Sequence, residues 1–179
     1  MGTASGSSQN ISNRDLLIAE SNEQGAFFDI VRVASRLEGE LNRVFRPYDL
    51  TTATYSILSI LERVKPEGLS CGDIAAQLIA EVPDMTRLLD RLERLEYVVR
   101  ERSALDRRMV KVRLTERGAE VVINLRGGVQ ECHQRQFRRL SPERLASLRE
   151  LVREVAKDEG IAMQESEEEE PPLRKQAGM

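Results

Sequence analysis

Residue types that carry most enzyme chemistry are scarce in this chain of 179 residues. It has no tryptophan, one histidine and two cysteines, and aromatic residues make up 4% of it. With few candidate nucleophiles or bases and no glycine-rich phosphate loop, the sequence does not predict an enzyme. The cysteines lie 61 positions apart, so no disulfide framework is predicted and a reducing, cytoplasmic location is expected. Clustered ligands are also missing, so we predict no metal site and no cofactor.

Long apolar runs are absent as well. None approaches the roughly 20 residues that a membrane span requires. The opening residues MGTASGSSQN have neither an apolar core nor a basic start, so they are not expected to be a secretory signal. We predict a flexible tail over 1–22. The remaining balance, 40% apolar and 32% charged, is typical of a helix-rich soluble protein.

The net charge of −3 is unevenly distributed. Residues 165–179 hold five Glu against one Arg and one Lys, so the other 164 residues sum to zero. Residues 82–114 hold nine Lys or Arg against six Asp or Glu. A local basic patch is what phosphate binding requires, so the overall charge does not exclude nucleic acid. Residues 164–179 are predicted to be a disordered acidic tail.

Apolar periodicity predicts several helices before residue 95. One covers about 24–47 and ends at Pro47. Thr51 or Thr52 is placed to cap a second, and Ser70 has the capping-box spacing to start a third that continues through Ile79. Pro83 is expected just inside the start of a fourth. The apolar stripe of this fourth helix comprises Met85, Leu88, Leu89, Leu92 and Leu95.

The periodicity then changes from helical to alternating. Residues 97–102 and 108–114 alternate apolar and polar side chains, which predicts a β-hairpin. Thr115 is placed to cap a fifth helix, and Ser141-Pro142-Glu143 to start a sixth. Their predicted inward faces comprise Val121, Val122, Leu125, Val129 and Cys132 in the fifth and Leu145, Leu148, Leu151, Val152 and Val155 in the sixth.

This order predicts a mainly α fold with a small β-hairpin, a winged helix-turn-helix flanked by helices at both ends. The winged module is expected over 48–114, and the flanking helices over 23–47 and 115–163. The apolar faces of the flanking helices are broad for packing against so small a module. We therefore expect a second subunit to cover them, which makes the protein a homodimer.

The fourth helix is the predicted reader of the DNA major groove, which meets base edges with its first residues. Asp84, Thr86 and Arg87 lie there, and Arg91 follows one turn later, where it is expected to meet phosphate. The alternative is a solvated helix whose charges pair internally, such as Asp90 with Arg94.

The hairpin adds a second basic element. Six basic residues fall within 14 positions, namely Arg100, Arg102, Arg107, Arg108, Lys111 and Arg113. Such charges could simply protect the edge of a small sheet from aggregation. However, Asp106 lies two positions before Arg108, so its carboxylate could hold that guanidinium for insertion into a minor groove.

The whole pattern resembles the multiple antibiotic resistance regulator (MarR) family of winged-helix repressors. The resemblance spans about 24–160 and is strongest over 50–118. It is carried by Leu50-Thr51, Leu69-Ser70, Thr86-Arg87 with Asp90-Arg91-Leu92, Asp106-Arg107-Arg108, and Leu114-Thr115 with Gly118, in this order and spacing.

The resemblance implies a homodimeric repressor on a pseudo-palindromic double-stranded DNA operator. It also implies a small-molecule effector pocket where the DNA-binding lobe meets the terminal helices, and it places Arg108 in the minor groove. The candidate DNA-binding residues are Ser70, Asp84, Thr86, Arg87, Arg91, Asp106, Arg107 and Arg108. The alternative function is a winged-helix protein-interaction module with only non-specific DNA binding.

Four positions need separate comment. Glu96 stands where the family usually has glycine, so the turn after the fourth helix is expected to be built differently. Gly127 and Gly128 interrupt the fifth helix, which predicts a kink or a close helix contact. Cys71 lies in the first turn of a helix, where the dipole favours a thiolate and oxidation; its alternative role is that of a small buried residue.

Overall fold

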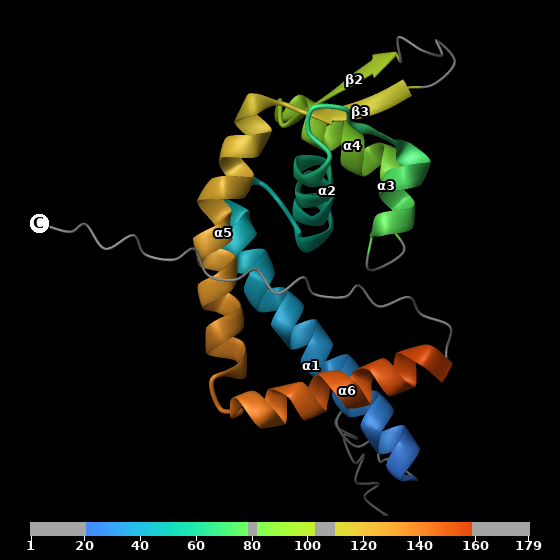
Figure 1. Ribbon diagram of the computed structural model, residues 1–179, viewed down its shortest axis with the longest axis vertical. Coiled ribbons are helices and arrows are strands. Elements are labelled where there is room, and N and C mark those ends of the chain that lie inside the picture. Colours follow the sequence, from blue (N-terminus) through green and yellow to red (C-terminus); the bar gives the residue numbers. More distant parts are fainter. Residues whose placement is uncertain (1–20, 79–81, 103–109, 159–179) are drawn as a thin grey trace, which may run out of the picture. The chain divides into compact units, whose positions relative to one another are not determined.

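The computed structural model describes residues 21–78, 82–102 and 110–158 (Figure 1). Its elements are α1 (Asn22–Phe45), the 3-10 helix η2 (Arg46–Tyr48), α2 (Thr52–Arg63), β1 (Leu69–Ser70), α3 (Cys71–Gln77), α4 (Met85–Arg94), β2 (Val98–Arg102), β3 (Val110–Leu114), α5 (Glu116–Phe137) and α6 (Pro142–Asp158). The chain forms two compact units, one through Gln134 and one from Arg135. Most of both predicted tails and the turn of the predicted hairpin lie outside the described residues.

Side-chain caps set where the helices of the first unit begin. The Thr51 hydroxyl accepts from the Thr54 amide at 3.3 Å, and the Thr54 hydroxyl accepts from the Thr51 amide at 2.8 Å. At α3 the Ser70 hydroxyl accepts from the Asp73 amide at 3.1 Å. The bonds are reciprocal at α2 and one-sided at α3, and they satisfy amides that the first helical turn leaves without partners, as the sequence predicted.

The predicted position of Pro83 was wrong. Asp84 is the N-cap of α4, because its carboxylate accepts from the Arg87 amide at 3.0 Å, so Pro83 lies before the helix rather than in its first turn. A carboxylate that satisfies a free amide defines the helix start more strongly than a proline that merely tolerates the position. The third helix also ends earlier than expected, at Gln77.

The predicted hairpin is part of a three-stranded antiparallel sheet with the order β1-β3-β2. In β1, Leu69 pairs with Val112 and Ser70 pairs with Lys111. Two residues are too few to show alternation, so the sequence did not reveal this strand. Gly68 permits the pairing, because its φ is +68° and a Cβ there would lie 2.5 Å from the Val112 carbonyl oxygen.

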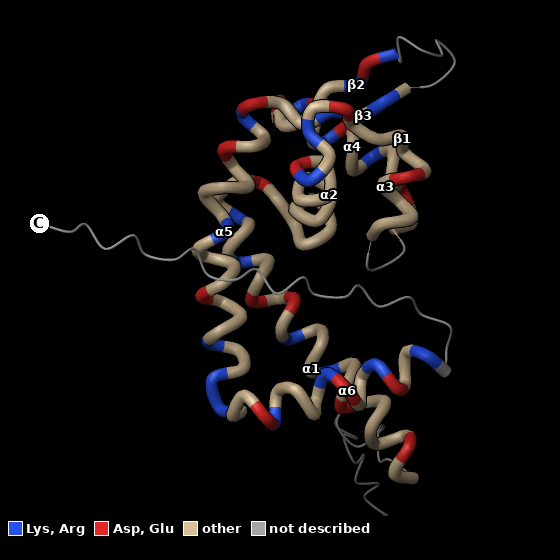
Figure 2. Tube along the Cα trace, in the orientation of Figure 1, with Lys and Arg blue, Asp and Glu red and all other residues tan. Residues whose placement is uncertain are grey.

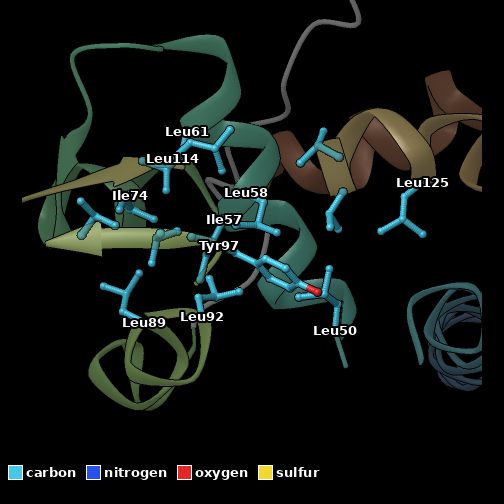
Figure 3. Packing of buried hydrophobic residues seen from close by; sticks show 14 of the residues in the cluster. Leu50, Ile57, Leu58, Leu61, Ile74, Leu89, Leu92, Tyr97, Leu114 and Leu125 are labelled. Carbon is cyan, nitrogen blue, oxygen red and sulfur yellow. The ribbon is translucent and has the colours of Figure 1, made fainter. Parts of the chain in front are cut away.

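The core lies between α2, α4, the sheet and the first part of α5 (Figure 3). Leu89 and Leu92 of α4 are fully buried there, together with Ile57 and Leu58 of α2 and Val112 of β3. Burying a side chain of this size stabilises the fold by about 1.5–3 kcal/mol. Because the apolar stripe of α4 is anchored inward, its charged residues are left on the other faces.

The turn after α4 differs from the expectation for Glu96. Glu96 adopts the left-handed conformation that glycine usually supplies, with φ of 60°. The Tyr97 amide then donates to the Leu92 carbonyl at 3.0 Å, which closes the helix end. Arg117 forms an ion pair with the Glu96 carboxylate at 2.5 Å, and the Thr115 hydroxyl donates to the Glu96 carbonyl at 2.7 Å. These contacts hold a conformation that costs about 1 kcal/mol or more without glycine.

Helix α5 runs unbroken through its two adjacent glycines. A Cβ at Gly128 would lie 3.2 Å from Cγ1 of Val44 in α1, whereas a Cβ at Gly127 would meet nothing within 4 Å. The predicted close helix contact is therefore confirmed at Gly128 only. In the described part of the chain, no helix combines the length and apolar character that a membrane crossing needs.

Candidate nucleic-acid interface

The start of α4 is exposed, as a groove-reading helix requires. Thr86 and Arg87 are exposed in its first turn. Asp84, predicted as a DNA contact, is also exposed, but its carboxylate is engaged as the helix cap. The predicted pair of base-reading candidates on the helix itself is thus Thr86 and Arg87.

Three arginines follow one another along the outer side of α4. Arg87, Arg91 and Arg94 have i, i+4, i+7 spacing, and with Asp49 they line an open hollow of about 540 Å³. Arg94 was not among the predicted DNA contacts. The sequence did indicate this position, because Arg94 follows Arg91 at a helical spacing just as Arg91 follows Arg87.

Arg91 lies against the loop before α2. Its Nη2 donates to the Asp49 carbonyl at 2.7 Å and lies 3.1 Å from the Asp49 carboxylate. The carboxylate of Asp49 therefore lies at the edge of the surface formed by Arg87, Arg91 and Arg94, which we call the arginine face. Nothing near Asp49 in the sequence indicates this contact, because the two residues are 42 positions apart.

The inner charges of α4 pair with β2 rather than along the helix. The pair of Asp90 with Arg94, given as an example of the alternative interpretation, is not formed: Asp90 Oδ1 lies 2.5 Å from Nη1 of Arg100. The same Nη1 lies 3.0 Å from the Glu93 carboxylate. Burial works to lower the pKa of Arg100, but the hydrogen bond and charge of Asp90 together with the charge of Glu93 raise that pKa above its ordinary value.

The basic residues of the hairpin divide into two groups. Arg100 and Arg113 are both engaged within the protein, the latter with Glu101 at 2.8 Å. Arg102 and Lys111 form no ion pair with another described residue, and basic positions of both strands are visible in Figure 2. The predicted Asp106, Arg107 and Arg108 lie outside the described residues.

Ser70 and Cys71 lie at the start of α3. The Ser70 hydroxyl donates to the Asp73 carboxylate at 2.7 Å while capping the helix, so it is engaged locally. Cys71 is exposed, which contradicts its interpretation as a small buried residue; Cys132 is the buried cysteine. Across 21–78, 82–102 and 110–158, no group of three or more acidic, His or Cys residues is arranged to hold a metal ion.

These elements define a winged helix-turn-helix. An anchored helix presents arginines outward, and a three-stranded antiparallel sheet, whose strands β2 and β3 follow it in the chain, carries further basic residues. The sequence model of the MarR family matches residues 48–109, which include α2, α3, α4, β1 and β2 and end just before β3.

The comparison with known proteins agrees. A MarR transcription factor from Planctomyces limnophilus is 33% identical, with 76% of this chain and 98% of that one covered and a TM-score of 0.59. The chain belongs to the MarR family, whose members are transcription regulators and not enzymes.

Two further relatives are informative. The transcriptional regulator PapX of Escherichia coli is 31% identical over 88 residues, which is 49% of this chain and 54% of PapX. The chain thus spans about half the length of the curated relatives it matches. A structure of mutant MarR from Escherichia coli complexed with operator DNA is 26% identical, covers 77% of this chain and 99% of that one, and has a TM-score of 0.67.

Proposed function

We propose that this protein is a dimeric repressor that binds a pseudo-palindromic DNA operator and is released by a small-molecule effector. Each subunit would place α4 in a major groove and its hairpin against the adjacent minor groove. The observation that supports this proposal best is the distribution of charge on α4. Its acidic residues face β2, whereas its arginines face outward.

This sorting creates a positive face on a helix with mixed charge. Asp90 and Glu93 share an ion pair with Arg100 of β2, whereas Arg87, Arg91 and Arg94 line a separate hollow. A helix fits the major groove, and arginines along it can contact both base edges and phosphates. The family relative complexed with operator DNA supports the same use of the fold.

The dimeric part of the proposal is supported by apolar surface on two helices. Helix α1 has 24 residues, of which only Phe45 is buried. Phe27 is 61% exposed and Leu151 of α6 is 60% exposed. Other large apolar residues exposed on these helices are Ile30, Val31, Val33, Leu148, Val152 and Val155. Soluble monomers rarely leave such faces uncovered, so a second copy is the simplest cover.

Family membership supports the effector part of the proposal. An effector that binds the DNA-free dimer better than the DNA-bound one must lower operator affinity by the ratio of its two affinities. The effector is found by screening small aromatic and anionic compounds for stabilisation of the dimer against heat. A compound counts only if it also releases the duplex described next.

The DNA-binding part is tested by selection from a randomised duplex pool. The purified chain is expected to enrich an inverted repeat and to bind it well above a scrambled duplex of equal length. Log affinity for the selected duplex should fall linearly with log salt, by about 0.9 per neutralised phosphate. Binding of every duplex with equal affinity would instead favour the protein-interaction module.

Charge variants locate the interface. Arg87→Ala is expected to lower affinity for the selected duplex and to relax its sequence preference, by about 1–3 kcal/mol if the guanidinium contacts a base. Arg94→Ala should weaken all duplexes alike and reduce the salt slope by about 1. The matched control is Arg126→Ala, which removes an arginine paired with Glu62 away from α4. Equal losses in all three variants would refute this interface.

A further inference from the structure

One side chain holds the underside of α4 to the sheet. Besides its ion pairs with Asp90 and Glu93, Arg100 donates from Nη2 to the Thr86 carbonyl at 3.2 Å. Its backbone amide donates to the other Glu93 carboxylate oxygen at 3.3 Å. Thr86, Asp90 and Glu93 lie four and three residues apart, so Arg100 contacts two successive turns of α4.

The position of Arg100 in the sheet explains why it reaches α4. It is paired with Val112, which is fully buried, so its side chain lies on the inner face of the sheet. Arg113 of β3 follows Val112 in the chain and pairs with Val99. Its side chain therefore lies on the outer face of the sheet. The Arg100 side chain is only 24% exposed, less than either carboxylate it binds.

The apolar contacts of α4 decide which face is buried, and the Arg100 contacts add a directional constraint. Leu89 and Leu92 bury α4 against the core, but burial of apolar surface is non-directional. The planar fork of an arginine is directional and preorganised, and it can hold several acceptors at once. Arg100 therefore adds directional contacts to the orientation that the leucines already set.

We propose that Arg100 is a positioning residue for DNA recognition, which fixes α4 relative to β2 so that helix and hairpin reach the duplex together. It acts through Asp90, Glu93 and the Thr86 carbonyl, and it does not itself contact DNA. A recognition site needs its first residues held within about 0.5 Å of their working positions. The inference rests on the proposed function. It assigns a role in DNA recognition to a residue of β2, which belongs to neither α4 nor the predicted turn of the wing.

The test compares Arg100→Met with Arg113→Met. Both remove one positive charge from the same sheet, so both should lower affinity for a scrambled duplex alike. Only Arg100→Met should reduce the ratio of selected-duplex to scrambled-duplex affinity, by roughly tenfold, the size of a typical coupling between contacting residues. An unchanged ratio in Arg100→Met would overturn the proposal, because a direct phosphate contact lowers both affinities together.

Two more variants separate positioning from charge. Arg100→Lys keeps the charge but loses the fork, so it should restore scrambled-duplex affinity without restoring the full ratio. In a chain that carries Asp90→Asn and Glu93→Gln, Arg100→Met should change the ratio by less than about twofold, since its partners are already lost. Two results would contradict action through the carboxylates. One is full recovery of the affinity ratio in Arg100→Lys, and the other is an equal effect of Arg100→Met on that ratio in both backgrounds.

Hydrogen exchange tests the same contact without DNA. Amides of Met85–Arg94 should exchange roughly tenfold faster in Arg100→Met and at the parent rate in Arg113→Met, because loss of the contact eases local opening. If Arg100→Met does not fold, Arg100→Lys takes its place. Exchange at the parent rate in Arg100→Met would overturn the positioning role. If the variant exchanges fast but the parent chain shows no sequence preference for DNA, only the proposed function is overturned.

Discussion

Replacing each of three glycines on α5 by alanine should change the free energy of unfolding differently, although the added methyl group is the same. At Gly118 a Cβ would lie 2.2 Å from the Tyr97 carbonyl oxygen and 2.8 Å from Cδ1 of Leu114. The oxygen belongs to the backbone of Tyr97, just before β2, so α5 or that segment must move by about 1 Å to restore ordinary contact. Overpacking of this kind costs about 1–3 kcal/mol, more than the roughly 1 kcal/mol that alanine gains over glycine in a helix.

Gly127→Ala is the matched control, because it adds the same methyl group where nothing lies within 4 Å. It should stabilise the protein by about 0.5–1 kcal/mol, which raises the Tm by roughly 2–4 °C for each kcal/mol in a chain of this size. Gly128→Ala, at 3.2 Å from Val44, should fall between the two. The assay is urea and thermal unfolding by circular dichroism at matched concentration. A Gly118→Ala protein as stable as the parent would refute the packing of α5 against Tyr97 and Leu114.

The remaining predictions concern charge and assembly. Asp49→Asn should raise DNA affinity at low salt by roughly fivefold or less, because an unscreened charge near phosphate costs about 1 kcal/mol in water; a loss measured by fluorescence anisotropy would contradict the arginine face. The Ser141 hydroxyl lowers the pKa of Glu143, so its stabilising effect is present above the unfolded pKa and is lost as pH falls through the folded one. The stability difference between parent and Glu143→Gln should therefore shrink from about pH 5 toward pH 3 in denaturant titrations, and a constant difference would exclude that bond. Leu148→Glu with Val152→Glu should yield monomers in sedimentation experiments and weaken operator binding; dimers of parental stability would place the interface elsewhere.

Local interactions made much of the fold predictable. The helical spacing of Leu89 and Leu92 indicated which side of α4 is buried, and the structure confirms it. The cap at Ser70 was also predictable, because donor and acceptor lie three residues apart. Strand β1 was not, since its two residues become a strand only by pairing with β3.

Contacts between distant residues were the hardest to predict. Asp90 has Arg94 at a favourable helical spacing, yet it pairs with Arg100, because β2 folds back beneath α4 and brings a more buried guanidinium within reach. Glu96 was expected to change the turn, but Arg117 and the residues around it hold the left-handed conformation instead. In both cases the deciding partner lies on another element, where periodicity carries no information.

Hydroxyl-radical footprinting of the selected duplex, with the number of bound chains measured by sedimentation, tests the central claim most directly. Two copies that each insert α4 and its hairpin should protect two symmetric patches about 10 base pairs apart, with two chains on each duplex. A single protected patch, or one chain bound at full affinity, would contradict paired recognition of neighbouring grooves.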